Sequence, residues 1–374
     1  MTSRDRVLDA INLKKPDIIP ADMGSTNCTS ISKFSYDKLK KKLGILNKSD
    51  RFLMEKFNIN RVDEEVLQIL NIDTRGIIGK LEAYPKTIIN EKTFYDHFGV
   101  KYFMPENGLY YDIVENPLAK MKSLEEIKEY QWPNPINKKF VEGLKNEAKR
   151  LHQENQYAIV GDVNDSGIFE PSWYLRGFEN FLYDLSMNPE ISLYIMEKML
   201  EFQKKRYAYF LSEVGEYLDI VFVGDDLATS NSTLISPKMY RSMIKPLQKD
   251  YFTFLKKHTK AKLMYHSCGN IGPFLNDLIE IGIDILNPIQ VNAMGMDIDW
   301  LKKEFGEKLC FWGGIDTSKI LPSGTVKEVI QEVKRVVKIL GPNGYVGCAV
   351  HDIQADVPAE NIIAMFQTFK SIRI

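Results

Sequence analysis

The sequence has few cysteines, no long apolar run and no excess of charge of either sign. Its four cysteines, Cys28, Cys268, Cys310 and Cys348, are widely spaced, so they do not suggest a disulfide framework. The N-terminal residues lack the apolar core of a signal peptide, and we therefore expect a protein of the reducing cytoplasm. No uncharged apolar run approaches the roughly 20 residues that a membrane-spanning helix needs, so we expect no membrane association.

The charge balance also argues against a nucleic-acid partner. The 49 basic and 50 acidic residues give a formal net charge of −1, and the Lys-rich stretch at 38–42 is short and isolated. A Gly-x-Ser-x-Gly motif is absent, which gives no support to a serine hydrolase, and Gly313-Gly314 lacks the spacing of a nucleotide-binding loop. The 44% of apolar residues in a chain of 374 is sufficient for one large core or two smaller ones.

Short apolar segments alternate with amphipathic helices from about Tyr157 onward, which is the pattern of parallel β/α units. A further strand at Ile18–Asp22 follows a basic amphipathic helix at about Ser3–Leu13. We therefore predict an α/β fold, a (β/α)8 TIM barrel, with a doubly wound open sheet as the competing architecture. The other predicted strands are Tyr157–Gly161, Asp219–Val223, Lys262–Tyr265, Ile285–Pro288, Leu309–Trp312 and Gly344–Val350.

The stretch at about 47–135 fits this alternation poorly, because it is rich in charge, Tyr and Phe. We predict one domain over residues 1–374, with this stretch as a lid-like or inserted subregion. Within it, Lys101–Met104 and Leu109–Val114 are expected to pair as a hairpin across Pro105–Gly108. Helix starts are predicted at Pro189, Pro237 and Pro358, because proline is favoured at the first position of a helix.

Polar residues gather directly after the predicted strands. In a parallel barrel the carboxyl ends of the strands share one face, which carries the catalytic groups in known TIM-barrel enzymes. The alternative is that many of these residues cap the next helix, and Asp316 and Asn270 are examples. The residues are Asp162, Asp165, Asp225, Asp226, His266, Cys268, Gln290, Asp316, Cys348 and His351.

His266 and Cys268 are the most informative pair. Residues two apart on a strand face the same side, so an imidazole and a thiolate can reach one ion, and zinc prefers these donors. A third donor is expected from the last strand, either Cys348 or His351. The soft thiolate of Cys348 suits zinc, whereas His351 has the advantage of lying at the tip of the strand. The alternative for Cys348 is a small buried side chain without a metal. We interpret Cys28 and Cys310 as structural.

The segment Gly167–Trp173 follows a strand and combines a carboxylate with aromatic rings. Phe169, Trp173 and Tyr174 are predicted to stack on or enclose a flat apolar substrate, and Glu170 to accept a hydrogen bond or to bind the metal. The alternative is a buried aromatic anchor at the start of a helix.

Several motifs together resemble the uroporphyrinogen decarboxylase superfamily, and in particular its zinc- and corrinoid-dependent methyltransferase branch. The match extends over nearly the whole chain, and it implies a single (β/α)8 barrel. In the coenzyme M methyltransferases of that branch, a His-x-Cys pair and a later Cys hold zinc, and His266 and Cys268 fit the pair. The later Cys aligns nearer His351 than Cys348. The motifs are Tyr265-His-Ser-Cys-Gly-Asn-Ile271, Leu286-Asn-Pro-Ile-Gln290, Phe311-Trp-Gly-Gly-Ile-Asp316 and His351-Asp-Ile-Gln354.

The resemblance implies that the chain moves a methyl group between a small substrate and a corrinoid carried by a partner protein. The favoured substrate is a methoxylated aromatic, with Asp225, Asp226 and Glu170 as catalytic residues and Phe169, Trp173, Gln290 and Asp316 as substrate-binding residues. The opposite direction, from methylcorrinoid to a thiol, is the alternative. True uroporphyrinogen decarboxylases carry an Arg-rich N-terminal motif, and residues 20–27 lack it. A decarboxylase of a smaller acid and a non-catalytic corrinoid-binding barrel are the remaining rivals.

Overall fold

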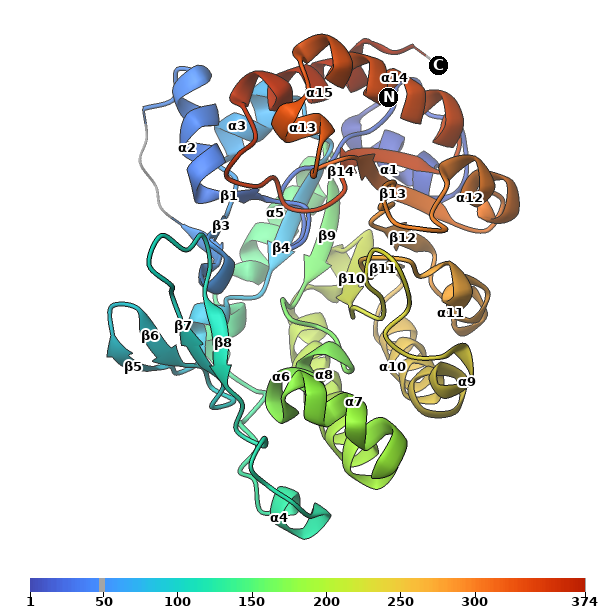
Figure 1. The fold of residues 1–374 in the computed structure, drawn as a ribbon. Coiled ribbons are helices and arrows are strands. Elements are labelled where there is room, and N and C mark those ends of the chain that lie inside the picture. Colours follow the sequence, from blue (N-terminus) through green and yellow to red (C-terminus); the bar gives the residue numbers. More distant parts are fainter. Residues whose placement is uncertain (47–50, 374) are drawn as a thin grey trace.

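The computed structural model describes residues 1–46 and 51–373. Its centre is a curved sheet of seven parallel strands in the order β14-β13-β12-β11-β10-β9-β4 (Figure 1). These strands are β4 (Thr74–Ile78), β9 (Ala158–Asp162), β10 (Ile220–Gly224), β11 (Lys262–His266), β12 (Ile285–Asn287), β13 (Cys310–Ile315) and β14 (Tyr345–Ala349).

The segment Pro20–Asp22 closes this sheet by joining its two edge strands. On one side the Asp22 amide donates to the Gly347 carbonyl at 2.9 Å, and the Gly347 amide donates to the Pro20 carbonyl at 2.8 Å. On the other side the Asp73 amide donates to the Ala21 carbonyl at 2.9 Å. The predicted strand at Ile18–Asp22 therefore supplies the eighth position, and the (β/α)8 barrel is confirmed over the open sheet.

The sequence pattern missed one barrel strand, β4. This strand lies inside the stretch at about 47–135 that was predicted to be inserted or lid-like, and the first residues of that stretch are outside the described part of the chain. Arg75 and Gly76 break the apolar run of β4, so the segment does not read as a buried strand.

The remainder of the stretch forms a four-stranded antiparallel sheet, β5-β6-β7-β8, beside the barrel (Figure 1). Its strands are β5 (Thr87–Asn90), β6 (Thr93–Tyr95), β7 (Lys101–Phe103) and β8 (Asp112–Glu115). The pairing of β7 with β8 confirms the predicted hairpin. A second small sheet has the order β1-β3-β2, and its strands are β1 (Ile31–Ser32), β2 (Phe52–Met54) and β3 (Ile59–Asn60).

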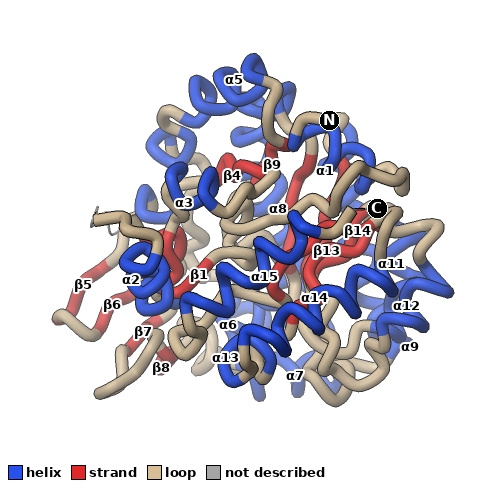
Figure 2. Tube along the Cα trace, turned by 90° about the horizontal axis from the view of Figure 1, so that it is seen from above, coloured by secondary structure: helices blue, strands red, loops and turns tan. Residues whose placement is uncertain are grey.

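Helices cover the outside of the barrel (Figure 2). The three predicted proline starts are confirmed, because α8 begins at Pro189, α9 begins at Pro237, and Pro358 is the N-cap of α15. The helices are α1 (Ser3–Ile11), α2 (Lys33–Lys42), α3 (Glu64–Ile69), α4 (Leu124–Lys128), α5 (Leu144–Glu154), α6 (Glu170–Arg176), α7 (Phe178–Met187), α8 (Pro189–Val214), α9 (Pro237–Met239), α10 (Lys245–His258), α11 (Leu275–Ile281), α12 (Ile298–Phe305), α13 (Ile320–Ser323), α14 (Val326–Leu340) and α15 (Ala359–Ser371). In the described residues no helix combines the length and apolarity needed to cross a membrane.

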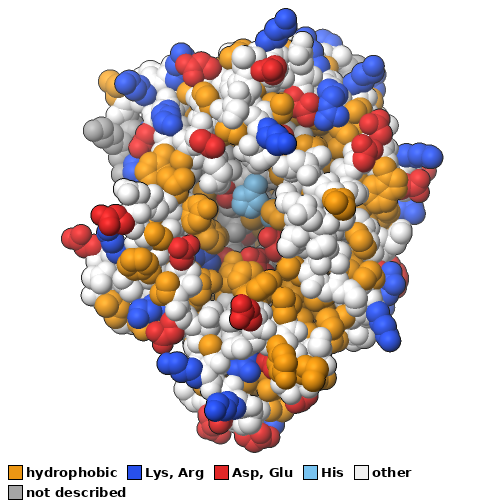
Figure 3. All heavy atoms as spheres, in the orientation of Figure 1, with side chains coloured by type: hydrophobic (Ala, Val, Ile, Leu, Met, Phe, Trp, Pro, Cys, Tyr) orange, Lys and Arg blue, Asp and Glu red, His pale blue; other side chains and the backbone are white. Residues whose placement is uncertain are grey.

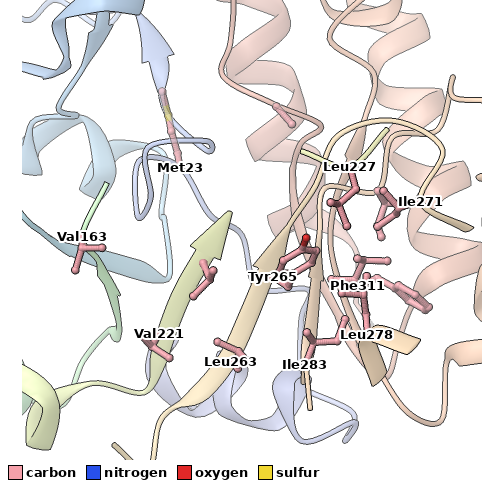
Figure 4. Packing of buried hydrophobic residues seen from close by; sticks show 14 of the residues in the cluster. Met23, Val163, Val221, Leu227, Leu263, Tyr265, Ile271, Leu278, Ile283 and Phe311 are labelled. Atoms are coloured by element: carbon pink, nitrogen blue, oxygen red, sulfur yellow. The ribbon is translucent and has the colours of Figure 1, made fainter. Parts of the chain in front are cut away.

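The barrel strands separate two apolar layers, because alternate residues face opposite sides of a strand. Val221, Leu263 and Tyr265 pack outward against the helices, in the layer shown in Figure 4. Phe222 and Met264 pack inward with residues of α1. The barrel interior is therefore a filled core, and polar side chains gather where the strands end.

Asp73 ties the barrel closure to the C-terminal helix. Its carboxylate accepts a hydrogen bond from the Ala21 amide at 2.7 Å and pairs with Lys370, and its side chain is 1% exposed. We expect Asp73→Ala to lower the free energy of unfolding by about 3 kcal/mol, because it leaves the Lys370 ammonium buried without its partner. Urea unfolding followed by circular dichroism measures this.

Asp37→Ala is the matched control, because it removes one member of the exposed Lys33–Asp37 pair and is expected to cost less than about 1 kcal/mol. A double variant with Asp73→Ala and Lys370→Met should recover part of the loss. Equal losses for Asp73→Ala and Asp37→Ala would contradict the role of Asp73 in closure.

Candidate metal centre

His266 and Cys268 lie together at the carboxyl end of β11. The Cys268 Sγ atom is 3.5 Å from His266 Nε2. β11 ends at His266, so the chain turns between the two residues and keeps both side chains on the same side. The geometry therefore has the two predicted donors close enough to bind one ion.

Asn287 fixes the orientation of the His266 ring. The Asn287 Nδ2 atom donates to the Trp312 carbonyl at 3.2 Å, which leaves Asn287 Oδ1 as the acceptor for His266 Nδ1 at 2.6 Å. The proton of the neutral imidazole is therefore on Nδ1, and the lone pair on Nε2 faces Cys268. Metal-binding histidines usually have such a partner for their other ring nitrogen.

Asp226 supplies the nearest oxygen donor. Its Oδ1 atom accepts a hydrogen bond from the Cys268 amide at 2.8 Å and lies 3.9 Å from His266 Nε2. Ligand atoms of Asp226, His266 and Cys268 all lie within 4.8 Å of one another. The same limit holds for a second group of three, which consists of Cys28, His266 and His351.

Cys28 is the residue of this cluster that the sequence analysis did not assign to it. It follows the first barrel strand by six residues, and the expectation that polar groups gather after strands would have found it if extended to that strand. Cys310 is buried at the start of β13, as expected for a structural cysteine.

The two candidates for the third ligand differ in position. Cys348 is 1% exposed and packs in the interior layer with Trp312 and Val346, outside both groups of neighbouring donors in the described residues. β14 ends at Ala349, so His351 lies beyond the strand and its ring centroid is 5.3 Å from that of His266. His351 Nδ1 accepts a hydrogen bond from the Asp352 amide at 2.8 Å, so Nε2 carries the proton of the neutral ring, and His351 binds a metal only if this hydrogen bond is broken. The geometry favours Asp226 or His351 over Cys348.

A cavity of about 490 Å³ opens onto this cluster. Figure 3 shows a hollow on the corresponding face, with pale-blue histidine atoms inside it. Four carboxylates line the cavity, and among the described residues no lysine or arginine does so. The carboxylates belong to Asp165, Glu170, Asp226 and Asp352.

Burial shifts the protonation of these groups. Burial and the neighbouring Asp226 charge raise the pKa of Glu170 to about 8, and burial raises the pKa of Asp352 to about 8. Burial lowers the pKa of His266 to about 4, so its imidazole is neutral at pH 7, which is the form that binds metal. The pKa of the Cys268 thiol is raised by burial and by Asp226. A cavity with excess acidic groups and neutral imidazoles favours a bound cation.

Asp225 has a different position from Asp226. Its carboxylate accepts hydrogen bonds from the amides of Ile168, Phe169 and Glu170 at 3.2, 2.9 and 2.7 Å. The side chain is 1% exposed, so Asp225 holds the start of α6 and does not face the cavity as a predicted catalytic group would.

Of the three aromatic residues predicted to enclose the substrate, Tyr174 lines the cavity, and Phe169 and Trp173 lie outside its wall. Phe169 is fully buried against Phe181, and Trp173 packs against Tyr174 and Phe178. The aromatic anchor weighed as the alternative describes both better, because the start of α6 turns them toward the core and the neighbouring helix. The aromatic residues that line the cavity are Phe57, Tyr110, Tyr174 and Phe222.

Gln290 and Asp316 have local structural roles. Gln290 Oε1 accepts a hydrogen bond from the Gly269 amide at 2.6 Å, which holds the turn after β11. Asp316 accepts hydrogen bonds from the amide and hydroxyl of Ser318, as expected for a residue that caps the following turn. Neither residue lines the cavity.

The sequence model described as Uroporphyrinogen decarboxylase (URO-D) matches residues 94–372, which is more than half of the chain. The chain belongs to the URO-D family. The match confirms the resemblance to this superfamily and agrees with the closed barrel. It begins within the β5–β8 sheet and contains His266, Cys268 and His351, but not Cys28.

Among solved structures, a methyltransferase from Methanosarcina mazei has the same fold as this URO-D family member, with a TM-score of 0.68. The sequences are 15% identical, and the alignment covers 99% of this chain and 98% of that one. A B12-independent methionine synthase from Shewanella sp. W3-18-1 is more distant, with a TM-score of 0.48, 10% identity and coverage of 94% and 96%. No curated protein matches the sequence.

The three hydrogen bonds to Asp225 predict a stability effect. Asp225→Ala leaves three buried amides without an acceptor, and we expect the free energy of unfolding to fall by at least about 2 kcal/mol. Asp225→Asn keeps one acceptor oxygen and should cost less. Thermal and urea unfolding measure both, and a fully stable Asp225→Ala variant would show that the carboxylate does not anchor α6.

Proposed function

We propose that this protein is a zinc-dependent methyltransferase, which moves a methyl group from a small substrate to a corrinoid carried by a partner protein. The observation that carries the proposal is the cluster of His266, Cys268 and Asp226, of which His266 and Asp226 line a cavity that no described lysine or arginine lines. The fold shared with a methyltransferase from Methanosarcina mazei is consistent with this reaction type.

The donors of the cluster fit zinc. A neutral imidazole nitrogen, a sulfur and a carboxylate oxygen are common zinc ligands, and a catalytic site keeps a further position open for the substrate. His266, Cys268 and Asp226 would hold the ion, or Cys28 and His351 would complete the set with His266. When bound, zinc withdraws charge from the substrate oxygen or sulfur that carries the methyl group.

Glu170 is the proton donor in this proposal. It lines the cavity, accepts a hydrogen bond from the Tyr174 hydroxyl, and keeps its proton near pH 7 because burial and Asp226 raise its pKa to about 8. In the forward direction a reduced corrinoid on the partner protein would accept the methyl group, and the electron pair of the broken methyl–oxygen bond would remain on the oxygen of the substrate. Glu170 then protonates the oxygen of the demethylated product.

The cavity wall favours a substrate with little negative charge and an aromatic ring. Phe57, Tyr110, Tyr174 and Phe222 provide ring surface, and no described lysine or arginine lines the wall to pair with an acidic group. Phe57 and Tyr110 belong to the stretch at about 47–135, so this part of the chain would act as the lid predicted for it. A methoxylated aromatic meets these requirements.

Two alternatives use the same site. A thiol substrate in the cavity would accept the methyl group from methylcorrinoid in the reverse direction. A decarboxylase of a polycarboxylate is disfavoured, because such a substrate needs cationic side chains and the described residues that line the cavity include none.

The metal is tested first. We expect the purified wild-type protein to contain about one zinc ion per chain by mass spectrometry, and Cys268→Ser to lose it because a ligand is removed. Cys348→Ser is the matched control and should retain zinc, since Cys348 lies in the interior layer. Comparison of Asp226→Asn with His351→Gln identifies the third ligand. Retention of zinc by Cys268→Ser would favour the Cys28–His266–His351 set, and retention by His266→Gln, which removes the ligand common to both sets, would reject the site.

Methyl transfer is tested with cobalamin reduced to the Co(I) state and a panel of methoxylated aromatics, methylamines and thiols. A change of the cobalt absorption spectrum to that of methylcobalamin is expected with a methoxylated aromatic. Glu170→Gln should lower the rate by about 10²-fold or more, as for loss of a general acid. Glu179→Gln is the control, because Glu179 is an exposed residue of α7. Full methyl transfer after removal of zinc by chelation would contradict the role of zinc, and release of carbon dioxide from a carboxylic acid without methyl transfer would favour the decarboxylase alternative.

A further inference from the structure

A second cavity lies outside the barrel wall and has a volume of about 820 Å³. Residues of α3, β4 and α5 line it, and it extends to the β5–β8 sheet through Phe94 and Tyr102. Met54 and Asp165 line both this cavity and the one at the candidate metal centre, so the two cavities are neighbours. We call it the outer cavity.

Basic residues around the outer cavity are mostly neutralised by carboxylates. Arg75 Nε lies 2.7 Å from Glu64, and Lys56 Nζ lies 2.7 Å from Asp165. Lys86 and Arg150 also have carboxylate partners, at 2.6 Å from Glu55 and Glu154. The wall of the cavity is therefore largely composed of satisfied ion pairs.

Arg61 is different. In the described part of the chain its guanidinium makes one hydrogen bond, from Nη2 to the Ile78 carbonyl at 3.3 Å, and it has no carboxylate within 4.0 Å. Burial lowers the pKa of Arg61, whereas the carboxylates of Glu82 and Glu147, which also line the cavity, raise it without forming an ion pair within 4.0 Å. A guanidinium remains charged even so, and Arg61 is half-buried, so holding this cation without a carboxylate in direct contact destabilises the protein.

A second unsatisfied group lies on the same wall. The Nε2 atom of His97 is buried and has no hydrogen-bond partner among the described residues. Burial lowers the pKa of His97 to about 3, so the ring is neutral and offers one hydrogen bond to a ligand. Tyr84, which stacks on His97 at a centroid distance of 4.4 Å, provides ring surface beside it.

We propose that the outer cavity binds a small organic anion whose carboxylate or phosphate pairs with Arg61. The planar guanidinium matches both groups with two parallel hydrogen bonds, and it would gain the charge partner that the chain does not supply. The anion is either the far end of a substrate that extends past Met54 and Asp165 or a separate ligand. The two sources present the same chemistry to Arg61.

The site is tested by isothermal titration of the full chain with inorganic phosphate and with 4-methoxybenzoate. We expect both anions to bind the wild-type protein, and Arg61→Gln to weaken binding at least tenfold. Arg150→Gln is the matched control. Arg150 also lines the outer cavity, but its side chain is 58% exposed and is already paired with Glu154. Arg61→Lys should recover part of the affinity.

Thermal unfolding separates a binding role from a structural one. If Arg61 is a ligand group, Arg61→Gln without anion should have a Tm equal to or above that of the wild type, and phosphate should raise only the wild-type Tm. A lower Tm for Arg61→Gln together with an unchanged response to phosphate would overturn the proposal. So would the absence of binding of both anions to the wild-type protein.

Competition then identifies the source of the anion. If 4-methoxybenzoate binds and displaces phosphate, and methoxybenzene does not, Arg61 recognises the carboxylate of an extended substrate. If phosphate and 4-methoxybenzoate bind independently, with only phosphate sensitive to Arg61→Gln, the outer cavity holds a separate ligand. These measurements follow binding alone, so they do not depend on zinc or on methyl transfer.

Discussion

Closure of the barrel is the constraint on which the rest of the structure depends. The hydrogen bonds of Pro20–Asp22 to Gly347 and Asp73 join the first and last strands, and they form a ring from segments that are more than 300 residues apart in sequence. Because the strands are parallel, all their carboxyl ends lie on one face. Cys28, Asp226, His266 and His351 follow four different strands and become neighbours only for this reason.

The adjacent carboxylates Asp225 and Asp226 show how neighbouring residues acquire different roles. Asp225 points away from the cavity and accepts three backbone hydrogen bonds that hold α6 in place. Asp226 faces the cavity, and among the described residues its carboxylate accepts one hydrogen bond, from the Cys268 amide. The first therefore positions Glu170, which begins α6, and the second remains available to a cation. Loss of Asp225 would disturb the cavity indirectly.

The two cavities differ in the charged groups that line them. Around the candidate metal centre, acidic groups and neutral imidazoles have no lysine or arginine beside them in the described wall, which favours a cation and an uncharged substrate. Outside the barrel, Arg61 is a cation without a carboxylate partner among the described residues, which favours an anion. The Lys56–Asp165 pair lies between the two regions and is itself neutralised at 2.7 Å. A ligand that reaches both would have a neutral reacting end and an acidic far end.

The sequence by itself determined the barrel, the hairpin of β7 and β8, the helix starts at the prolines, and the adjacency of His266 and Cys268, because these depend on local periodicity and on turn and cap chemistry. It missed β4, whose apolar pattern is interrupted by Arg75 and Gly76. It did not place Cys28 in the cluster, and it assigned the pocket wall to Phe169 and Trp173, which pack elsewhere. Only the tertiary structure decided these points, since the direction of a side chain at a strand end depends on turns and on packing against helices distant in sequence. Tertiary structure also decided that Arg61 has no ion-pair partner among the described residues, because this depends on which carboxylates the fold brings near it.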